Sequence, residues 1–349
     1  MQQDIRFCTS VDGVNIASTT TGAGFPLVRA GTWLSHLDCD IRHTEPRAYI
    51  RALSRSHTYV RYDTRGCGLS DRKVSSLTFE DGVKDLEAVV DSRKLDQFAL
   101  LGISMGAATS VAYAVRHPER VSHLVLMNGF ATSVFSTPNV SQRALDEAAL
   151  VLKSAEFGWN STKSIFRKIF VAQLLGNPSA EQQLELEERM QLSMSGEMAV
   201  AYMRNNYAID VAALCAQVTV PTLVFQCRKD QMIGFEQGRR MAAMIPGSKF
   251  VPLEAQGHIL LSTEPAMQVF ETEVSAFLGT AGELPQLTPR QVQVLVAIGG
   301  GQTDKEIAKS LSLSPRTVEM HVAGALKALA CSHRAEAVLK ASALRLLSQ

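Results

Sequence analysis

The sequence of 349 residues lacks several features that would define its class directly. No apolar run reaches the roughly 18 residues that a membrane-spanning helix needs, and the start MQQDIRFCTS has neither the basic nor the apolar region of a signal peptide. The 6 cysteines show neither CxxC nor Cys/His ligand spacing, which argues against a disulfide framework and a zinc site. We therefore expect a cytoplasmic protein with reduced cysteines and no membrane contact, and we predict neither a metal nor a cofactor.

A strong charge of one sign is also absent, but the charge is unevenly distributed. The whole chain carries a formal net charge of +1. From Leu284 onward 8 Lys/Arg stand against 4 Asp/Glu, a net +4, whereas the preceding part has 27 against 30, a net −3. This modest basic bias is compatible with a polyanion partner for the end of the chain and argues against one for the rest.

The residues that are present suffice for two folded domains. Hydrophobic residues make up 46% of the chain and charged residues 20%, values typical of globular proteins. Because single cores stop growing at about 250 to 300 residues, we predict one large and one small domain. We place the large domain at residues 1–278, a linker at 279–285 and the small domain at 286–349.

The large domain has the pattern of an α/β protein. Short β-branched or apolar runs alternate with helical patterns, which predicts a mostly parallel sheet covered by helices on both faces. The predicted strands are VNIAST, FPLV, HTYVRY, QFALLG, VSHLVLM, PTLVFQC and SKFVPL.

One strand leads into a serine flanked by glycines. The run FALL precedes Gly102-Ile103-Ser104-Met105-Gly106, and a helical pattern follows. Strand, sharp turn and helix are the context of a nucleophile elbow, in which the glycines let a strained serine rise above the sheet. The plain alternative is a glycine-lined turn with an incidental serine, so the motif must be judged with its partners.

The partners of a serine nucleophile follow in the expected order. On this fold an acid and then a histidine come after the serine. Asp230 lies just past the strand PTLVFQC, and His258 lies in the loop after SKFVPL. We therefore predict a triad of Ser104, Asp230 and His258.

The large domain resembles the α/β-hydrolase family. Besides the elbow it carries DTRGCGLSD at residues 63–71, which matches a second family signature. The resemblance implies an oxyanion hole formed by the amide of Met105 and one amide of the loop AGTWLSH, given by Thr32 or Trp33. That loop departs from the usual His-Gly pair of the family.

About 95 residues separate the strands VSHLVLM and PTLVFQC, and their patterns are helical. In the family an insert at this point forms a helical cap, which we place at about 129–216. Methionines and a tyrosine in the insert predict an apolar ligand pocket, although helix core is the commoner use of methionine. Arg29, at a strand end, either faces an anionic ligand or forms a structural salt bridge. The predicted pocket residues are Arg29, Trp33, Met127, Met194, Met198 and Tyr202.

The small domain shows three short helices with clear starts. Thr288-Pro289-Arg290-Gln291 and Thr303-Asp304-Lys305-Glu306 are capping boxes, and Ser314-Pro315 opens the third helix. In the third helix one face is apolar and the other polar. Two helices joined by a tight corner, with a free outer face, indicate an all-α helix-turn-helix domain. A helical dimerisation module is the alternative.

This region resembles LuxR-type DNA-binding domains along its whole length. LTPRQ, KEIAKSL, LSPRTVEMHV and RAEAV carry the match. The resemblance implies a double-stranded DNA partner, and the last helix, AEAVLKASALRLL, would supply the seam of a homodimer. The implied phosphate contacts are Lys305, Arg316, Thr317, His321 and Lys327, and the implied base-facing residues are Glu319, Met320 and Ala323.

The leading hypothesis is a transcription regulator that senses a small molecule through the large domain and binds DNA through the small one. The main alternative is an active ester, lactone or C–C bond hydrolase that carries a DNA-binding tail. A protein interaction module without a ligand is a third. The complete triad argues against the third hypothesis, and the DNA-binding domain argues against a purely metabolic enzyme.

Overall fold

The computed structural model describes residues 3–162, 164–279, 287–329, 331–343 and 346–347. They belong to two compact units, a large unit, Met1–Ala281, and a small unit, Gly282–Gln349. Of the predicted linker 279–285, only Gly279 lies among the described residues. Within the described part of the chain, no helix is long and apolar enough to span a membrane.

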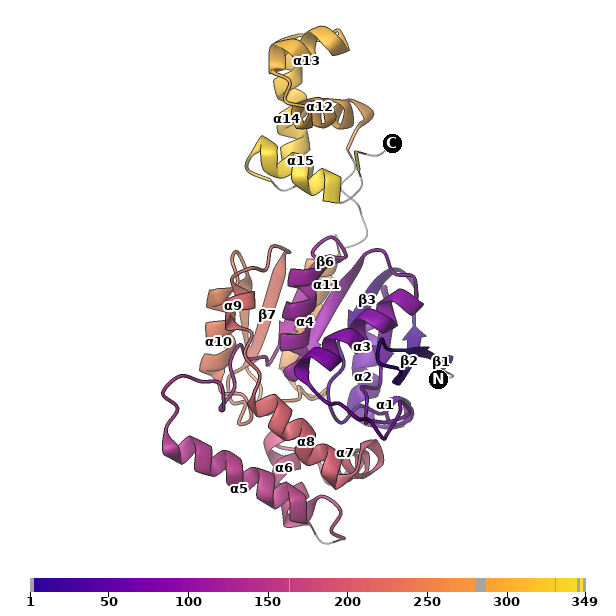
Figure 1. Cartoon of the computed structure of the whole chain (residues 1–349), viewed down its shortest axis with the longest axis vertical. Helices are drawn as coiled ribbons and strands as arrows, with labels where there is room; N and C mark the ends of the chain where they lie inside the picture. Colours follow the sequence, from indigo (N-terminus) through magenta and orange to yellow (C-terminus); the bar gives the residue numbers. More distant parts are fainter. Residues whose placement is uncertain (1–2, 163, 280–286, 330, 344–345, 348–349) are drawn as a thin grey trace. The chain divides into compact units, whose positions relative to one another are not determined.

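The large unit is built on one sheet of eight strands in the order β1-β2-β4-β3-β5-β6-β7-β8 (Figure 1). Pairs β1/β2 and β2/β4 are antiparallel, and the other pairs are parallel. All seven predicted strands are present, and β1 is additional. The strands are β1 (Ile5–Thr9), β2 (Asn15–Thr21), β3 (Phe25–Arg29), β4 (His57–Tyr62), β5 (Phe98–Ile103), β6 (Val121–Met127), β7 (Thr222–Cys227) and β8 (Lys249–Leu253).

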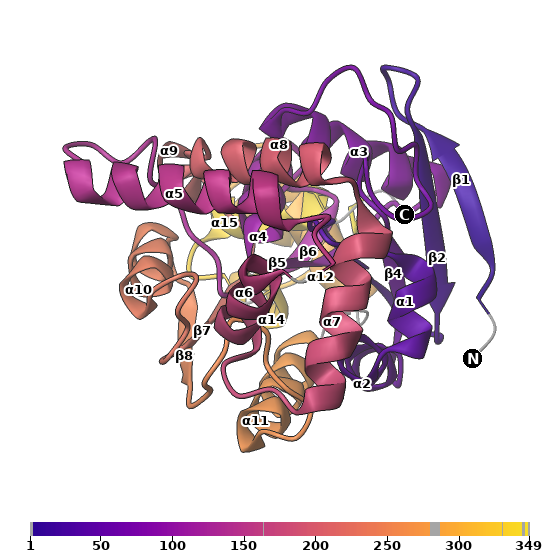
Figure 2. The same cartoon turned by 90° about the horizontal axis from the view of Figure 1, so that it is seen from below.

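Helices cover both faces of this sheet, which confirms the predicted α/β class. Apolar residues of α3, α4 and α10 pack on one face, and those of α2 and α11 pack on the other (Figure 2). The helices outside the β6–β7 insert are α1 (Leu37–Arg42), α2 (Thr44–Leu53), α3 (Phe79–Ser92), α4 (Met105–Arg116), α10 (Phe235–Met244) and α11 (Pro265–Leu278).

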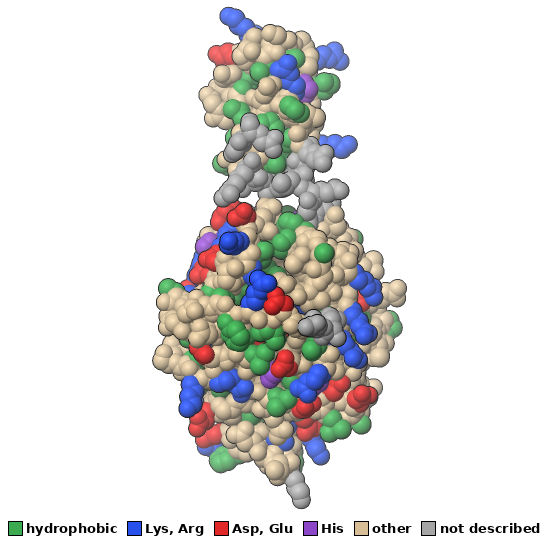
Figure 3. Space-filling model, turned by 90° about the vertical axis from the view of Figure 1, so that its right-hand side faces the viewer, with side chains coloured by type: hydrophobic (Ala, Val, Ile, Leu, Met, Phe, Trp, Pro, Cys, Tyr) green, Lys and Arg blue, Asp and Glu red, His purple; other side chains and the backbone are tan. Residues whose placement is uncertain are grey.

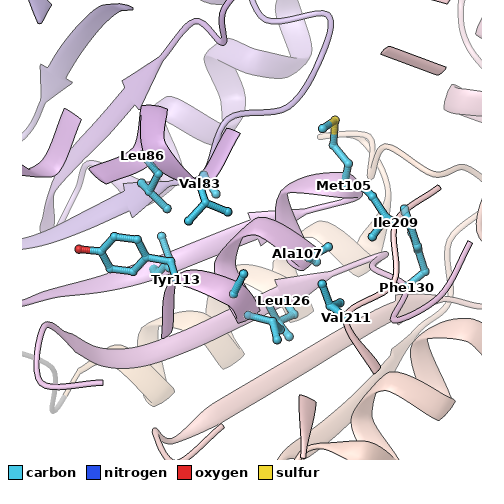
Figure 4. Close-up of a cluster of buried hydrophobic side chains, with 14 of the residues drawn as sticks. Val83, Leu86, Met105, Ala107, Tyr113, Leu126, Phe130, Ile209 and Val211 are labelled. Carbon is cyan, nitrogen blue, oxygen red and sulfur yellow. The ribbon is translucent and has the colours of Figure 1, made fainter. Parts of the chain in front are cut away.

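The larger core lies between the sheet and the helices α3 and α4. Val83 and Leu86 of α3 meet Ala107 and Tyr113 of α4 above Leu126 of β6, and all five are fully buried (Figure 4). Burying one such aliphatic or aromatic side chain stabilises the fold by about 1.5 to 3 kcal/mol. This packing holds the start of α4 firmly against the end of β5.

The β6–β7 insert contains five helices, of which α5 to α8 lie together at one end of the sheet, whereas the short α9 lies beside α10 (Figure 1). Helix α5 packs against α6 and α8, and α7 packs against α6 and α2. The ring of Trp33, in the loop after β3, stacks on Trp159 at 6.0 Å and meets Phe170 edge to face at 5.6 Å. The helices are α5 (Gln142–Gly158), α6 (Ile165–Leu175), α7 (Ala180–Ser193), α8 (Gly196–Tyr207) and α9 (Ala212–Cys215).

A buried ionic cluster also ties the insert to the sheet. Arg61 of β4 donates to Asp40 of α1 at 2.5 Å, and Arg189 of α7 donates to the other oxygen of the same carboxylate. Burial alone would raise the pKa of Asp40, but Arg189, Arg61 and Arg29 lower it to about 2. One carboxylate therefore joins α1, β4 and α7.

The small unit contains α12 (Pro289–Gly299), α13 (Asp304–Leu311), α14 (Pro315–Leu329) and α15 (Arg334–Ala343). Thr288 and Thr303 form capping boxes with Gln291 and Glu306, as predicted. Ser312, at φ 54° and ψ 46°, makes the left-handed corner between α13 and α14. These helices form the predicted all-α helix-turn-helix arrangement.

Replacing the shared carboxylate tests the ionic cluster. Asp40→Asn should lower the free energy of unfolding by about 3 to 5 kcal/mol at pH 7, because two buried guanidinium groups lose their counter-charge. Since the pKa of Asp40 in the folded state is about 2, below the unfolded value of about 3.9, this stabilisation is present above about pH 4 and is lost as the pH falls through 2. Urea unfolding measures both effects. Asp38→Asn, an exposed change on the same helix, is the control, and equal losses in the two variants would contradict the prediction.

Candidate functional site

Ser104 occupies a strained turn between β5 and α4. Its backbone has φ 55° and ψ −127°, a region that residues with a side chain rarely adopt. A Cβ on Gly102 would lie 2.6 Å from Cα of Ala107, and one on Gly106 would lie 3.2 Å from the carbonyl oxygen of Ala30. Close backbone approach therefore requires glycine at residue 102, and it leaves little room for a side chain at residue 106. The half-buried Ser104 hydroxyl does not cap α4 and makes no hydrogen bond to any described residue.

Asp230 and His258 meet at the carboxyl ends of β7 and β8. Nδ1 of His258 lies 2.7 Å from Oδ2 of Asp230. The other carboxylate oxygen accepts the backbone N–H groups of Met232 at 2.8 Å and Ile233 at 2.9 Å, which fixes the acid. With Nδ1 donating to Asp230, Nε2 of a neutral imidazole is left to accept a proton.

The expected bond between Ser104 and His258 is not formed in this structure, since no hydrogen bond joins them among the described residues. Such contacts are often long in sites without a ligand and shorten when one binds. The structure therefore brings the acid and the histidine together, whereas the Ser104 hydroxyl makes no hydrogen bond to His258.

Two buried amides support this arrangement and were not predicted. Asn128, directly after β6, donates from Nδ2 to the carbonyl oxygen of His258 at 2.5 Å and accepts from the N–H of Cys227 at 2.8 Å. Gln226 of β7 donates to Asp230 at 3.3 Å and to the carbonyl oxygen of Ile233 at 2.9 Å. The sequence signal that could have identified these two residues is a polar residue within or directly after an apolar strand run.

The backbone near Ser104 leaves amides for an oxyanion. Met105 is the first residue of α4, so its N–H has no carbonyl one turn earlier to bond. The N–H groups of Thr32 and Trp33 make no hydrogen bond to other described residues. The loop that carries them lies close to the start of α4: a Cβ added at Gly106 would lie 3.2 Å from the side chain of Thr32. The amides of Met105, Thr32 and Trp33 are thus not engaged by described residues, and which loop amide completes the hole stays a prediction.

A cavity of about 110 Å³ lies beside these residues, between the strand ends, α2 and α7. Its lining includes His258, Ile103, which directly precedes Ser104, and Met127, whose carbonyl oxygen accepts the Ser104 N–H at 2.9 Å. Ser104 itself is not in the lining. Of the predicted pocket residues, Arg29 and Met127 line this cavity.

The other predicted pocket residues do not line this cavity, and Tyr202 lines a smaller cavity of about 10 Å³ together with Gly31 and Met105. Trp33 packs on the aromatic rings of the insert, and Met194 is 1% exposed in the core. The side chain of Met198 faces Gly66, and Tyr202 donates its hydroxyl to the carbonyl oxygen of Arg65 at 2.7 Å. Met194 and Tyr202 are buried in the core, whereas Trp33 and Met198 are partly buried.

Arg29 also differs from its expected structural role. Among the described residues no carboxylate lies within salt-bridge distance of its guanidinium group, whose Nη2 donates to Oγ1 of Thr32 at 3.2 Å. The ion pairs of this region instead join Asp40 to Arg61 and Arg189. The predicted salt bridge of Arg29 is therefore wrong, and the alternative of an anionic ligand stays.

The small unit presents the predicted DNA-facing residues on the outer side of α14 and on α13. Val318, Val322, Ala325 and Leu329 are buried on the inner face of α14. Thr317 and His321 are partly buried, and the hydroxyls of Thr317 and Ser314 are 2.7 Å apart. Figure 3 shows basic side chains at the surface of this unit. The exposed residues are Lys305, Arg316, Glu319, Met320, Ala323 and Lys327.

The mostly parallel sheet, the strained serine and the adjoining acid–histidine pair define the α/β-hydrolase class. Residues 40–265 match the family described as alpha/beta hydrolase fold, and residues 285–341 match the family described as bacterial regulatory proteins, luxR family. The chain therefore belongs to the α/β-hydrolase family and carries a LuxR-type DNA-binding domain.

Individual relatives match the hydrolase part. AB hydrolase superfamily protein YisY of Bacillus subtilis is 25% identical over 252 residues, 68% of this chain and 86% of that protein. Rhodomycin D methylesterase DnrP of Streptomyces peucetius is 26% identical over 235 residues, 60% and 78% of the two chains.

Solved structures show the same fold. An esterase from Exiguobacterium antarcticum has a TM-score of 0.66 at 23% identity and covers 78% of this chain and 98% of its own. An enol-lactonase from Burkholderia xenovorans has a TM-score of 0.62 at 22% identity, with 78% and 100% covered. At these identities the likeness concerns the fold alone.

The role of Asn128 can be tested by labelling Ser104 with a fluorophosphonate. Asn128→Ala should slow labelling about 10- to 100-fold, because the loop that carries His258 loses its tie to β6 and β7. Ser104→Ala should abolish labelling and serves as the background control. Mass spectrometry of the labelled peptide measures both. Wild-type labelling rates in Asn128→Ala would show that the bond to His258 does not position the base.

Proposed function

We propose that this chain is a transcription regulator whose hydrolase unit senses a small molecule and whose LuxR-type unit binds DNA. The observation that carries the proposal is the presence, in one chain, of a DNA-binding regulatory domain and a cavity that adjoins the Ser104, Asp230 and His258 constellation. We propose a cytoplasmic location, because a transcription regulator acts where the DNA lies.

The cap supports the sensing part of this proposal. The cavity is lined from the sheet by Ile103 and Met127 and from α7 of the cap by Leu186 and Arg189. A ligand held there contacts both layers, so its binding energy depends on where the cap lies. A ligand can shift such an equilibrium only through its differential affinity for the two positions.

An active hydrolase with a DNA-binding tail is the second candidate. The His258–Asp230 hydrogen bond of 2.7 Å and the Ser104 hydroxyl without a hydrogen bond favour this candidate. A receptor that does not cleave its ligand needs neither an oriented base nor a free nucleophile. The relatives named methylesterase and esterase suggest an ester or lactone as the substrate class. A regulator that slowly cleaves its own ligand would unite the two candidates.

The DNA-binding part of the proposal involves a homodimer on a site with two-fold symmetry. Helix-turn-helix units contact successive major grooves in pairs, one helical turn apart. Leu339 of α15 is 72% exposed and Val296 of α12 is 49% exposed, so the small unit has apolar side chains left for a second copy.

Reciprocal coupling separates the regulator from the fused enzyme. An operator is first selected from random DNA by the full chain, and the rate of fluorophosphonate labelling of Ser104 is then measured with and without that operator. If the two units are coupled by the typical ~1 to 3 kcal/mol, the affinity of each site changes about 5- to 150-fold when the other is filled. A labelled chain should therefore bind operator with altered affinity. Identical operator affinity before and after labelling would favour the fused-enzyme candidate.

The DNA face has its own test. Lys305→Ala should weaken binding to all DNA sequences and reduce the slope of log affinity against log salt by about 0.9, because one phosphate contact is lost. Glu319→Ala and Met320→Ala should instead change which sequences bind. Electrophoretic shifts at several salt concentrations measure these effects. Lys168→Ala removes the same charge from an exposed position of α6 and should leave binding unchanged; an equal loss there would show only a general charge effect.

A further inference from the structure

Arg29 stands apart from the other arginines around the cavity. It ends β3 in the middle of the sheet, and part of its side chain is exposed to the cavity that His258 also lines. Its Nη2 donates to Thr32 at 3.2 Å, and no described carboxylate lies within salt-bridge distance. A buried guanidinium group without an anion is costly, so the position favours a negatively charged partner.

The surrounding protein does not supply that partner. Asp40 is already shared by Arg61 and Arg189, and Nε of Arg189 is buried without a hydrogen-bond partner. Burial lowers the pKa of Arg29, but the nearby Tyr59 and Asp40 raise it above its usual value, so the group stays charged. Three guanidinium groups, those of Arg29, Arg61 and Arg189, thus lie near the one carboxylate of Asp40.

Two glutamates also line the cavity, but their oxygens are engaged. Glu45 accepts the N–H of Ser262 at 2.6 Å and Nε2 of Gln182 at 2.6 Å. Glu185 accepts the N–H of Thr44 at 2.8 Å and its hydroxyl at 3.1 Å. These carboxylates are held by donors of the α2 and α7 region rather than by Arg29.

The remaining lining is mostly apolar. Ile103, Met127, Leu175, Leu186 and Ile259 contribute aliphatic or thioether side chains. Arg189 also lines the cavity but is paired with Asp40, so Arg29 is the lining guanidinium group without a paired carboxylate among the described residues. An apolar wall with such an anchor fits an amphipathic ligand with an acid group at one end.

We propose that the cavity binds a small carboxylate with an apolar body, and that Arg29 is the residue that holds the carboxylate. The proposal deepens the proposed function, on which it rests for the identity of the ligand site. In the sheet, Arg29 pairs with Leu101, three residues before Ser104. At about 3.3 Å per residue, roughly 10 Å separate the levels of the anchor and the serine along β5. A short chain is therefore enough to link the acid group to a reacting or contacting group near His258.

Hexanoate and hexanamide test this subsite because they share size and shape and differ in charge. Isothermal titration of the full chain should show hexanoate binding at least 10-fold more tightly than hexanamide, the gain expected of a charge-assisted, two-point contact. Arg29→Gln should remove this preference without weakening hexanamide. Arg29→Lys should keep part of it, because the charge stays but the fork geometry is lost. Arg228→Gln, an exposed arginine paired with Glu254, is the matched control and should behave as the wild type.

The following results would overturn the proposed subsite. Equal binding of the two compounds, or no binding of hexanoate, removes the anionic anchor. A preference that survives in both Arg29 variants assigns the carboxylate to another place, such as the oxyanion hole. The failure of the subsite and the failure of the proposed function can be told apart. If Ser104 is labelled and the operator is bound, but hexanoate is not preferred over hexanamide, only the subsite is rejected. A preference that depends on Arg29, with no effect of hexanoate on operator binding, keeps the subsite and rejects the sensor.

Discussion

The close approach of α4 to the end of β5 is the constraint on which the hydrolase unit depends. With a Cβ at residue 102 only 2.6 Å from the backbone of Ala107, no larger residue fits there, and Ser104 in the same turn holds a strained backbone with φ 55° and ψ −127°. The strain is held by the packed core of α3, α4 and the sheet, since Val83, Ala107 and Leu126 are fully buried. Ser104 and the first amides of α4 therefore lie at the carboxyl ends of the strands, where the loops that carry Asp230 and His258 begin.

The sequence allowed much of this to be predicted, because several signals are local. A glycine-flanked serine after an apolar run, an acid and a histidine after later strands, and capping boxes at Thr288 and Thr303 are each determined within a few residues. The inner and outer faces of α14 followed from helical spacing alone. The strand β1 was missed, since its five residues show no regular alternation and none of them is fully buried.

What could not be predicted depends on residues that are distant in sequence. Asn128 reaches His258 across 130 positions, and Asp40 reaches Arg189 across 149 positions. Local patterns hold no information about such pairs. For the same reason the sequence left a salt bridge open for Arg29, whereas Asp40 pairs with Arg61 and Arg189, and it placed Met194 in the pocket although this side chain is buried in the core. Sequence spacing can indicate that a side chain points inward, but whether that side chain packs against other atoms or lines a cavity depends on the complete fold.

The aromatic contact between the cap and the body has one more consequence. The chain contains 2 tryptophans, and both, Trp33 and Trp159, lie in this contact with ring centroids 6.0 Å apart. Trp33 belongs to the loop after β3, whereas Trp159 belongs to the cap. Intrinsic tryptophan emission of the whole protein therefore originates from the joint that must change if the cap moves. Tryptophan fluorescence of the unlabelled protein therefore reports the position of the cap, because the sequence contains no other indole.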